Sequence, residues 1–150
     1  MPGRIEAENY DKGGEGVAYH DATPTNPDGI YRNDGVDLQL ANDTGGGYKV
    51  KTAVAGEWLK YTVNVASART YAIDVRVSSS GAGGTFHVEV DGVNVTGAMT
   101  VPNTGGWNAW STVTKTGVSL TAGQHVVRLV LDTNGSSTGM TGNFNYIDVR

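Results

Sequence analysis

The chain of 150 residues is long enough for one domain that buries about two-thirds of the surface exposed by its unfolded form. Its 11 basic and 15 acidic residues give a formal charge of −4 without any basic cluster, which argues against nucleic acid as a partner. There is no cysteine for disulfides or thiolate chemistry, and no apolar run near the ~20 residues of a membrane-spanning helix, so no membrane partner is expected.

The chain opens with one short predicted strand, at residues 4–7. The residues before it, Met1-Pro2-Gly3, are expected to have been added in place of a signal peptide or neighbouring domains. The domain then covers residues 4–150. On such a strand Glu6 and Glu8 would face the same side. Two neighbouring carboxylates suit calcium, which takes about six to eight oxygen ligands; the alternative is two solvated glutamates on an edge strand.

A long segment from Asn9 to Gly47 follows, dense in Gly, Asp, Asn and Pro. Only residues 16–21 and 36–40 resemble strands within it. A segment of this length without regular structure is usually functional or held in place, often by a metal.

The rest of the chain has strand patterns about every ten residues. They cover residues 57–65, 70–77, 85–90, 93–96, 110–118, 124–131 and 143–149. Asp91-Gly92 is the best hairpin turn, and helical periodicity is absent. This pattern predicts an all-β fold, a β-sandwich of two antiparallel sheets.

The last of these strands is expected to pair with the first. That pairing would bring Asp148 to Glu6 and Glu8, and would point Asn145 into a ligand cleft. The alternative is an edge strand with ordinary polar residues.

Trp107 is the strongest candidate for contact with a sugar. It follows two glycines, where a core position is difficult, and an exposed indole offers a flat face for a sugar ring. The alternative is an indole that only anchors a loop. Trp110 and Trp58 are expected to pack, Trp58 on the opposite face of its strand from Leu59 and Tyr61.

No catalytic motif is present. His20, His87 and His125 are scattered, and no nucleophile elbow, zinc-binding helix or phosphate loop occurs. No pair of acids is marked as facing each other across a cleft, as glycoside hydrolysis would need. The three histidines are therefore expected to be surface residues or residues with satisfied hydrogen bonds, and no catalytic residue is predicted.

Five short motifs occur in an order that resembles a known family. They are Ile5-Glu6-Ala7-Glu8, Gly45-Gly46-Gly47 before Gly56-Glu57-Trp58-Leu59-Lys60-Tyr61, Thr104-Gly105-Gly106-Trp107-Asn108-Ala109-Trp110, Leu120-Thr121-Ala122-Gly123-Gln124-His125, and Phe144-Asn145-Tyr146-Ile147-Asp148. Over residues 4–150 the chain resembles carbohydrate-binding module family 6, the β-jelly-roll modules attached to bacterial polysaccharide-degrading enzymes. The resemblance implies a secreted, monomeric, non-catalytic module with a structural calcium.

The resemblance also implies roles for individual residues. Glu6, Glu8 and Asp148 would be the carboxylate ligands of the calcium, helped by a backbone carbonyl near Tyr48. Trp107 matches the stacking tryptophan, Asn145 the asparagine that hydrogen-bonds the sugar, and Gln39 a position often held by glutamate.

One position departs from the family pattern. Thr52 stands where an aromatic commonly faces the stacking tryptophan, and the loss of one stacking face is expected to weaken binding about fivefold. Either Tyr31 supplies the second wall, or the cleft is shallow; some members of the family bind on the concave face of a sheet instead. Lys49 and Lys51 near the cleft would suit an anionic or sulfated polysaccharide.

Three hypotheses for function remain open. The leading one is a module that binds a polysaccharide or oligosaccharide and holds an attached glycoside hydrolase or lyase on it. The second is a calcium-stabilised structural or adhesion sandwich without a working sugar site, and the third is a small jelly-roll lyase or hydrolase. Xylan, mixed-linkage or 1,3-glucan and agarose-like galactans are all within the family's range.

Overall fold

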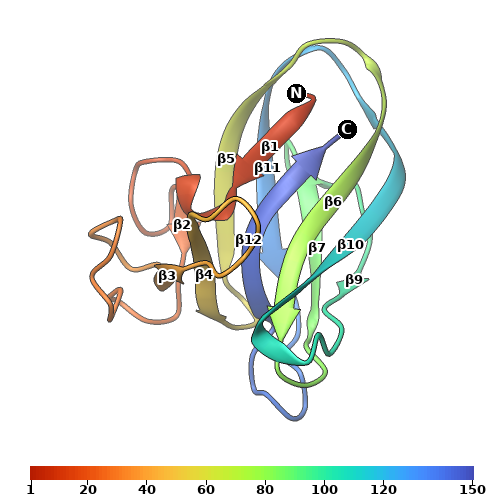
Figure 1. Ribbon diagram of the computed structural model, residues 1–150. Helices are drawn as coiled ribbons and strands as arrows, with labels where there is room; N and C mark the ends of the chain where they lie inside the picture. The colour runs from red at the N-terminus through yellow and green to blue at the C-terminus, as the bar shows by residue number, and fades with distance from the viewer.

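The computed structural model describes residues 1–150 and confirms the predicted all-β sandwich (Figure 1). The strands are β1 (Gly3–Glu6), β2 (Tyr19–His20), β3 (Leu38–Leu40), β4 (Tyr48–Ala53), β5 (Trp58–Val65), β6 (Arg69–Ser79), β7 (Thr85–Val90), β8 (Val93–Asn94), β9 (Met99–Thr100), β10 (Gly106–Leu120), β11 (Gly123–Leu131) and β12 (Gly142–Val149). The single helical element is the 3-10 turn η1 (Ala7–Asn9), and the structure has no helix that could cross a membrane.

Two antiparallel sheets make up the sandwich. The first has the order β10-β6-β12-β4-β3, with β1 also paired to β12. The second has the order β2-β5-β11-β7-β8, with β9 also paired to β7. Both chain termini lie near one end of the sandwich, because β1 and β12 run side by side there (Figure 1).

The closing strand β12 is a central strand rather than an edge. It pairs antiparallel with β1, as predicted, in a register that sets Ile5 opposite Ile147. It also pairs with β4 and with β6. The alternative of an edge strand is therefore wrong, and β12 organises the first sheet.

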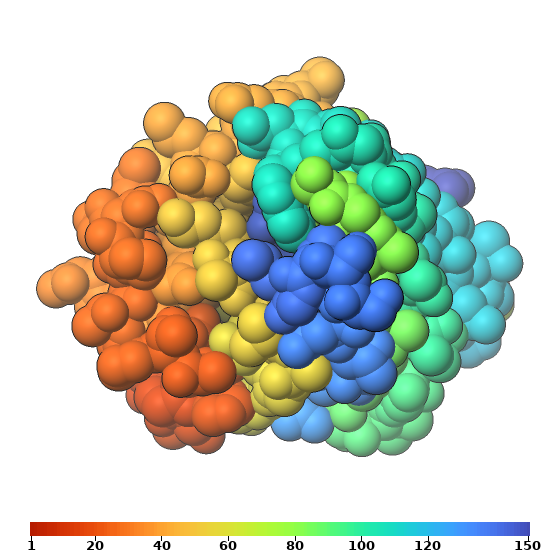
Figure 2. All heavy atoms as spheres, turned by 90° about the horizontal axis from the view of Figure 1, so that it is seen from below, coloured from red at the N-terminus to blue at the C-terminus, as the bar shows by residue number.

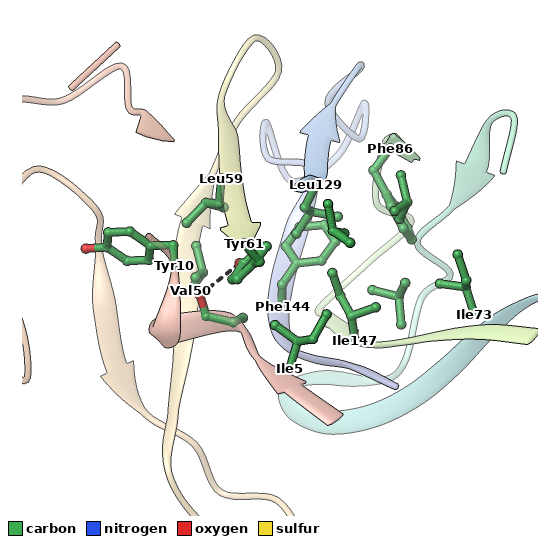
Figure 3. Packing of buried hydrophobic residues seen from close by; sticks show 14 of the residues in the cluster. Ile5, Tyr10, Val50, Leu59, Tyr61, Ile73, Phe86, Leu129, Phe144 and Ile147 are labelled. Atoms are coloured by element: carbon green, nitrogen blue, oxygen red, sulfur yellow. Dashed lines mark hydrogen bonds between the residues drawn. The ribbon is translucent and has the colours of Figure 1, made fainter. Parts of the chain in front are cut away.

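The core confirms the alternation read from the sequence. Leu59 and Tyr61 on β5 are buried, and so are Tyr71, Ile73 and Val75 on β6. Figure 3 shows how side chains of the two sheets meet between them.

Two contacts tie the second sheet to the first sheet and to η1. The rings of Phe86 and Phe144 meet edge to face at 5.2 Å, and the Tyr61 hydroxyl donates to the Ala7 carbonyl at 2.9 Å (Figure 3). Aromatic pairs of this kind add roughly 0.5–1.5 kcal/mol to simple burial.

The structure corrects several predicted strand limits. The first strand ends at Glu6, because the chain turns into η1 at Ala7. The strand β4 was not predicted, and β10 begins at Gly106 rather than at Trp110. Each of these differences falls on a residue expected in a binding or metal site.

The long segment between residues 9 and 47 is held by side chains. The Tyr10 hydroxyl donates to Asp34, and the Arg32 guanidinium lies 3.6 Å from the centre of the Tyr10 ring. The Glu57 carboxylate accepts the backbone N–H of Ala22 at 3.1 Å. This network of side-chain contacts anchors the segment.

Candidate functional site

Two irregularities in the first sheet shape its end near Gly142. On β4, Lys51 and Thr52 both lie opposite the single residue Asn143, between the partner pairs Gly142–Ala53 and Phe144–Val50. Thr52 has a φ of 53°, a value that a β-branched residue rarely adopts. Such a bulge twists the strand, and strained residues of this kind gather at ligand sites.

The second irregularity lies on β10. Gly106 pairs with Ser79 and Trp110 with the adjacent Ser78, so residues 107–109 protrude from the ladder. This protrusion explains how Trp107 is part of a strand and yet half-exposed, where the sequence indicated a loop.

The two bulges flank an open recess of about 230 Å³, which we name the Trp107 hollow. It is lined by Gln39, Lys49, Lys51, Thr52, Trp107, Met140 and Asn143. Figure 2 views the end of the sandwich where the segments near residues 50, 105 and 140 meet. Pockets that enclose a small molecule measure about 300–1,000 Å³. This smaller, open recess therefore suits one portion of a long ligand better than a small ligand that is fully enclosed.

The backbone carbonyl of Trp107 is fixed by three donors. The Ser78 hydroxyl donates at 2.8 Å, the Lys49 ammonium at 3.2 Å and the Asn143 amide at 3.3 Å. The indole therefore sits on a rigid base, which lowers the entropy lost when a ligand stacks on it.

Four of the six predicted ligand-binding residues meet in this hollow. They are Gln39, Lys51, Thr52 and Trp107. The sequence separates them by up to 68 positions, and the strand order β10-β6-β12-β4-β3 brings them to one sheet end.

Asn145 does not line the hollow. Its amide donates to Asp43 at 2.9 Å, and Asp43 also makes two hydrogen bonds of 2.9 Å with the Arg76 guanidinium. The ladder with β6 shifts register between Phe144 and Tyr146, so simple alternation fails at this point. Asn143 occupies the place in the hollow that was predicted for Asn145.

Tyr31 does not form a second wall opposite Trp107. Its ring stacks on that of Tyr48 at 4.6 Å, and its hydroxyl donates to Asn9. The prediction of a shallow cleft is the alternative that fits, with one aromatic face.

Met140 and Asn143 are the lining residues that the sequence analysis missed. Met140 adds an apolar, polarisable side chain in the turn just before β12. The repeated Asn-x-Asn spacing of Asn143 and Asn145 was the available signal, but the bulge decides which of the two enters the hollow.

The predicted trio of calcium ligands does not come together. The structure has no group of three acidic or histidine side chains placed to hold a metal. Glu6 lies near Arg4, and Asp148 stands opposite Arg4 in the β1–β12 ladder. Tyr48 meets Glu8 through its backbone N–H, at 3.0 Å, rather than through its carbonyl.

Among the predicted calcium ligands, Glu8 has the clearest features of a cation ligand. It is 4% exposed, and its Oε2 is buried without any hydrogen-bond partner. Burial raises the pKa of Glu8, and the nearby carboxylate of Glu6 raises it further. A buried carboxylate oxygen without a partner is unfavourable unless a cation meets it, so Glu8 and Glu6 fit two ligands of a calcium.

A second aromatic surface lies on the outer face of the other sheet. There Trp58 lies 5.1 Å from the Lys60 ammonium and 5.5 Å from the Arg128 guanidinium, measured to the ring centre. Glu89 accepts from Arg128 at 2.7 Å and meets His87 at 3.1 Å. We name this surface the Trp58 face.

The comparisons with known proteins decide the family. The family model described as "Carbohydrate binding module (family 6)" matches residues 28–150, most of the chain. The chain belongs to this family. It is thus a carbohydrate-binding module of a non-catalytic family, and the resemblance read from its motifs is confirmed.

Solved structures agree along the whole length. A module from Cellvibrio mixtus lichenase 5A, in complex with cellotriose, is 29% identical with a TM-score of 0.71, over 99% of this chain and 96% of that one. A β-1,3-glucan-binding family 6 module from Bacillus halodurans is also 29% identical with a TM-score of 0.71, over 99% and 95%.

A curated relative is much longer than this chain. The clotting factor G alpha subunit of Tachypleus tridentatus is 32% identical over 114 residues, which are 75% of this chain. The matched part spans only 15% of that relative's length.

Proposed function

We propose that the Trp107 hollow is the sugar-binding site of this carbohydrate-binding module. The observation that carries the proposal is the half-exposed indole of Trp107, fixed by three hydrogen bonds at the edge of an open polar recess. A sugar ring presents C–H groups to the indole face while its hydroxyls turn to polar side chains. Met140 adds apolar contact at the same recess.

Two side chains supply the hydrogen bonds. The amide nitrogen of Asn143 is used within the protein, while its Oδ1 accepts no hydrogen bond from the chain and is available to a sugar hydroxyl. Gln39 is exposed on the edge strand β3, opposite Lys49, with both amide atoms free. Asn143 and Gln39 therefore take the polar roles, and Asn145 has none.

The module is proposed to hold an attached enzyme on a polysaccharide outside the cell. The Cellvibrio relative is a module of a lichenase, which supports a glycoside hydrolase or lyase in the same native chain. The termini lie at the end of the sandwich where β1 begins and β12 finishes, away from Gly142 and the hollow (Figure 1). A domain joined at either terminus would leave the hollow open.

A calcium ion at Glu8 and Glu6 is proposed as a structural cofactor. The buried, unpartnered Oε2 of Glu8 supports it. When bound, the ion would neutralise two neighbouring carboxylates where β1 passes into η1. Asp148 is not proposed as a ligand, because it stands opposite Arg4.

Affinity electrophoresis tests the binding site. The protein is run through gels that contain one soluble polysaccharide each, β-1,3-glucan, mixed-linkage glucan, xylan or agarose-like galactan. We expect retardation by at least one glycan, lost in Trp107→Ala and kept in Trp58→Ala.

Retardation that is kept in Trp107→Ala and lost in Trp58→Ala would place the site on the Trp58 face instead, where an indole and charged side chains also lie together. Absence of retardation by every glycan would favour the structural or adhesion sandwich instead.

A further inference from the structure

Lys49 is the one buried cation of the molecule. It is 2% exposed, and no arginine and no other lysine is buried. Its ammonium donates to the Trp107 carbonyl at 3.2 Å and to Asn108 Oδ1 at 2.9 Å, both neutral acceptors. An ammonium carries three N–H groups, so one remains without a hydrogen-bond acceptor in the chain. The centre of the Trp110 ring lies 5.7 Å from this ammonium and supplies a weak cation–π contact, but no negative charge.

Two carboxylates of the same fold, by contrast, are held by cations. Asp43 is paired with Arg76 at 2.9 Å, and Glu89 with Arg128 at 2.6 Å. Burial of a charge without a partner is costly, and the pKa of Lys49 is lowered by this burial and by the nearby Lys51. The fold therefore keeps a positive charge in an unfavourable setting at its ligand site.

The Trp107 hollow holds no acid that could balance this charge. Its lining includes two lysines and no carboxylate. Lys51 is paired with Asp28 at 2.7 Å, and the residue opposite Lys49 on β3 is the neutral Gln39. Of the two lysines that line the hollow, Lys49 is thus the one whose charge no carboxylate balances.

We propose that the glycan bound in the Trp107 hollow carries an anionic group, a carboxylate or a sulfate ester, that binds the ammonium of Lys49. The inference rests on the proposed function of the hollow and names its ligand class. An anion would take the free N–H in a charge-assisted hydrogen bond, which is about twice as strong as a neutral one. Because Lys49 also holds the Trp107 carbonyl, stacking and anion recognition share one anchor.

Neutral and anionic forms of the same polysaccharide show how much of the binding depends on the charge of the glycan. The panel is β-1,3-glucan in unmodified, C6-carboxylated and sulfated forms, and polygalacturonate beside its methyl ester. At low salt we expect the anionic member of at least one set to bind about tenfold more tightly than its neutral partner. Preference for the carboxylated or for the sulfated form identifies the anion, and the preference should shrink as salt is added.

Three variants locate the effect. Lys49→Met should reduce the preference to about one, Lys49→Arg should keep it, and Lys115→Met on the exposed part of β10 should leave it unchanged. Melting curves check that each variant folds. If Lys49→Met is unfolded, the salt dependence of the wild-type preference decides.

Two results would overturn the inference in different ways. Equal binding of neutral and anionic partners, abolished by Trp107→Ala, would remove the anion and leave the proposed function standing. Failure of every glycan to bind would remove both.

Discussion

At the scale of single residues, the sequence indicated which kinds of side chain form the site better than it indicated which individual residues line it. The hollow brings together four of the residues that the motifs indicated, Trp107, Gln39, Lys51 and Thr52. Asn145 lies outside the hollow and donates to Asp43, on a strand that shifts register against β6 between Phe144 and Tyr146.

The two asparagines of β12 give opposite predictions. Asn143→Ala should weaken glycan binding about tenfold, because its Oδ1 is free for the ligand. It should also lower the free energy of unfolding by about 1 kcal/mol, because its amide donates to the Trp107 carbonyl and the Ser78 hydroxyl. Asn145→Ala should leave binding unchanged and lower the free energy of unfolding by about 1–2 kcal/mol, because Asp43 loses a buried donor. Titration calorimetry and urea denaturation of both variants measure the two effects; weaker binding by Asn145→Ala would contradict this assignment.

Asp43 adds a prediction about pH. Its hydrogen bonds with Arg76 lower the pKa of Asp43 to about 2, from an unperturbed value of 3.8. Because the folded pKa is the lower one, the stabilisation is complete above about pH 4 and is lost as pH falls toward 2. Asp43→Asn should be less stable than the wild type at pH 7, with the difference narrowing between pH 4 and pH 2 in denaturation curves. A constant difference over that range would contradict the role of the ion pair.

At the scale of elements, the strand patterns of the second half were predictable because their apolar residues alternate without interruption. Leu59, Tyr61, Ile73 and Val75 are buried as expected. The places where alternation breaks could not be read: η1 ends β1 after Glu6, and bulges displace Thr52 and Trp107. Such breaks depend on the register of neighbouring strands, which is a property of the assembled sheet.

The turn into η1 leads to a prediction about calcium. Calcium should raise the melting temperature of the wild type by roughly 5–10 °C at 100 times its Kd, and chelator should reverse the shift. Glu8→Gln should lose this response yet be at least as stable as the calcium-free wild type, because it removes an unpartnered buried charge.

Asp148→Asn is the matched control and should keep the calcium response. Differential scanning calorimetry measures the calcium-dependent shift of the melting temperature in both variants, and so shows which of the two carboxylates binds the ion. Loss of the response in Asp148→Asn would restore the original trio of ligands.

The loops beside the hollow depend on close backbone contact. A Cβ added at Gly84 would lie 1.7 Å from the Thr133 carbonyl oxygen, whereas at Gly106 the nearest atom would be 3.9 Å away. Gly84→Ala should therefore lower the free energy of unfolding by about 3 kcal/mol or more, or roughly 6–12 °C in Tm. Gly106→Ala should change Tm by only a few degrees, and equal melting of the two variants would contradict the contact.

At the scale of the whole molecule, the fold and the family followed from the sequence because strand spacing, turns and five ordered motifs agreed with one another. The site needed the structure, since four strands of one sheet, β3, β4, β10 and β12, bring together residues from Gln39 to Asn143. The absence of a facing aromatic at Thr52 leaves one stacking wall. Binding of a single sugar chain should accordingly be modest in affinity and depend strongly on Trp107.

The indole N–H signals of the three tryptophans offer the most direct test of this claim. The ¹H–¹⁵N spectrum is recorded with increasing amounts of a retarding glycan, and Trp107→Phe assigns the Trp107 signal. The account predicts that the Trp107 signal shifts with saturation while the Trp58 signal stays in place. A shift of the Trp58 signal with an unchanged Trp107 would show that the sugar binds on the other sheet and that the Trp107 hollow is not the site.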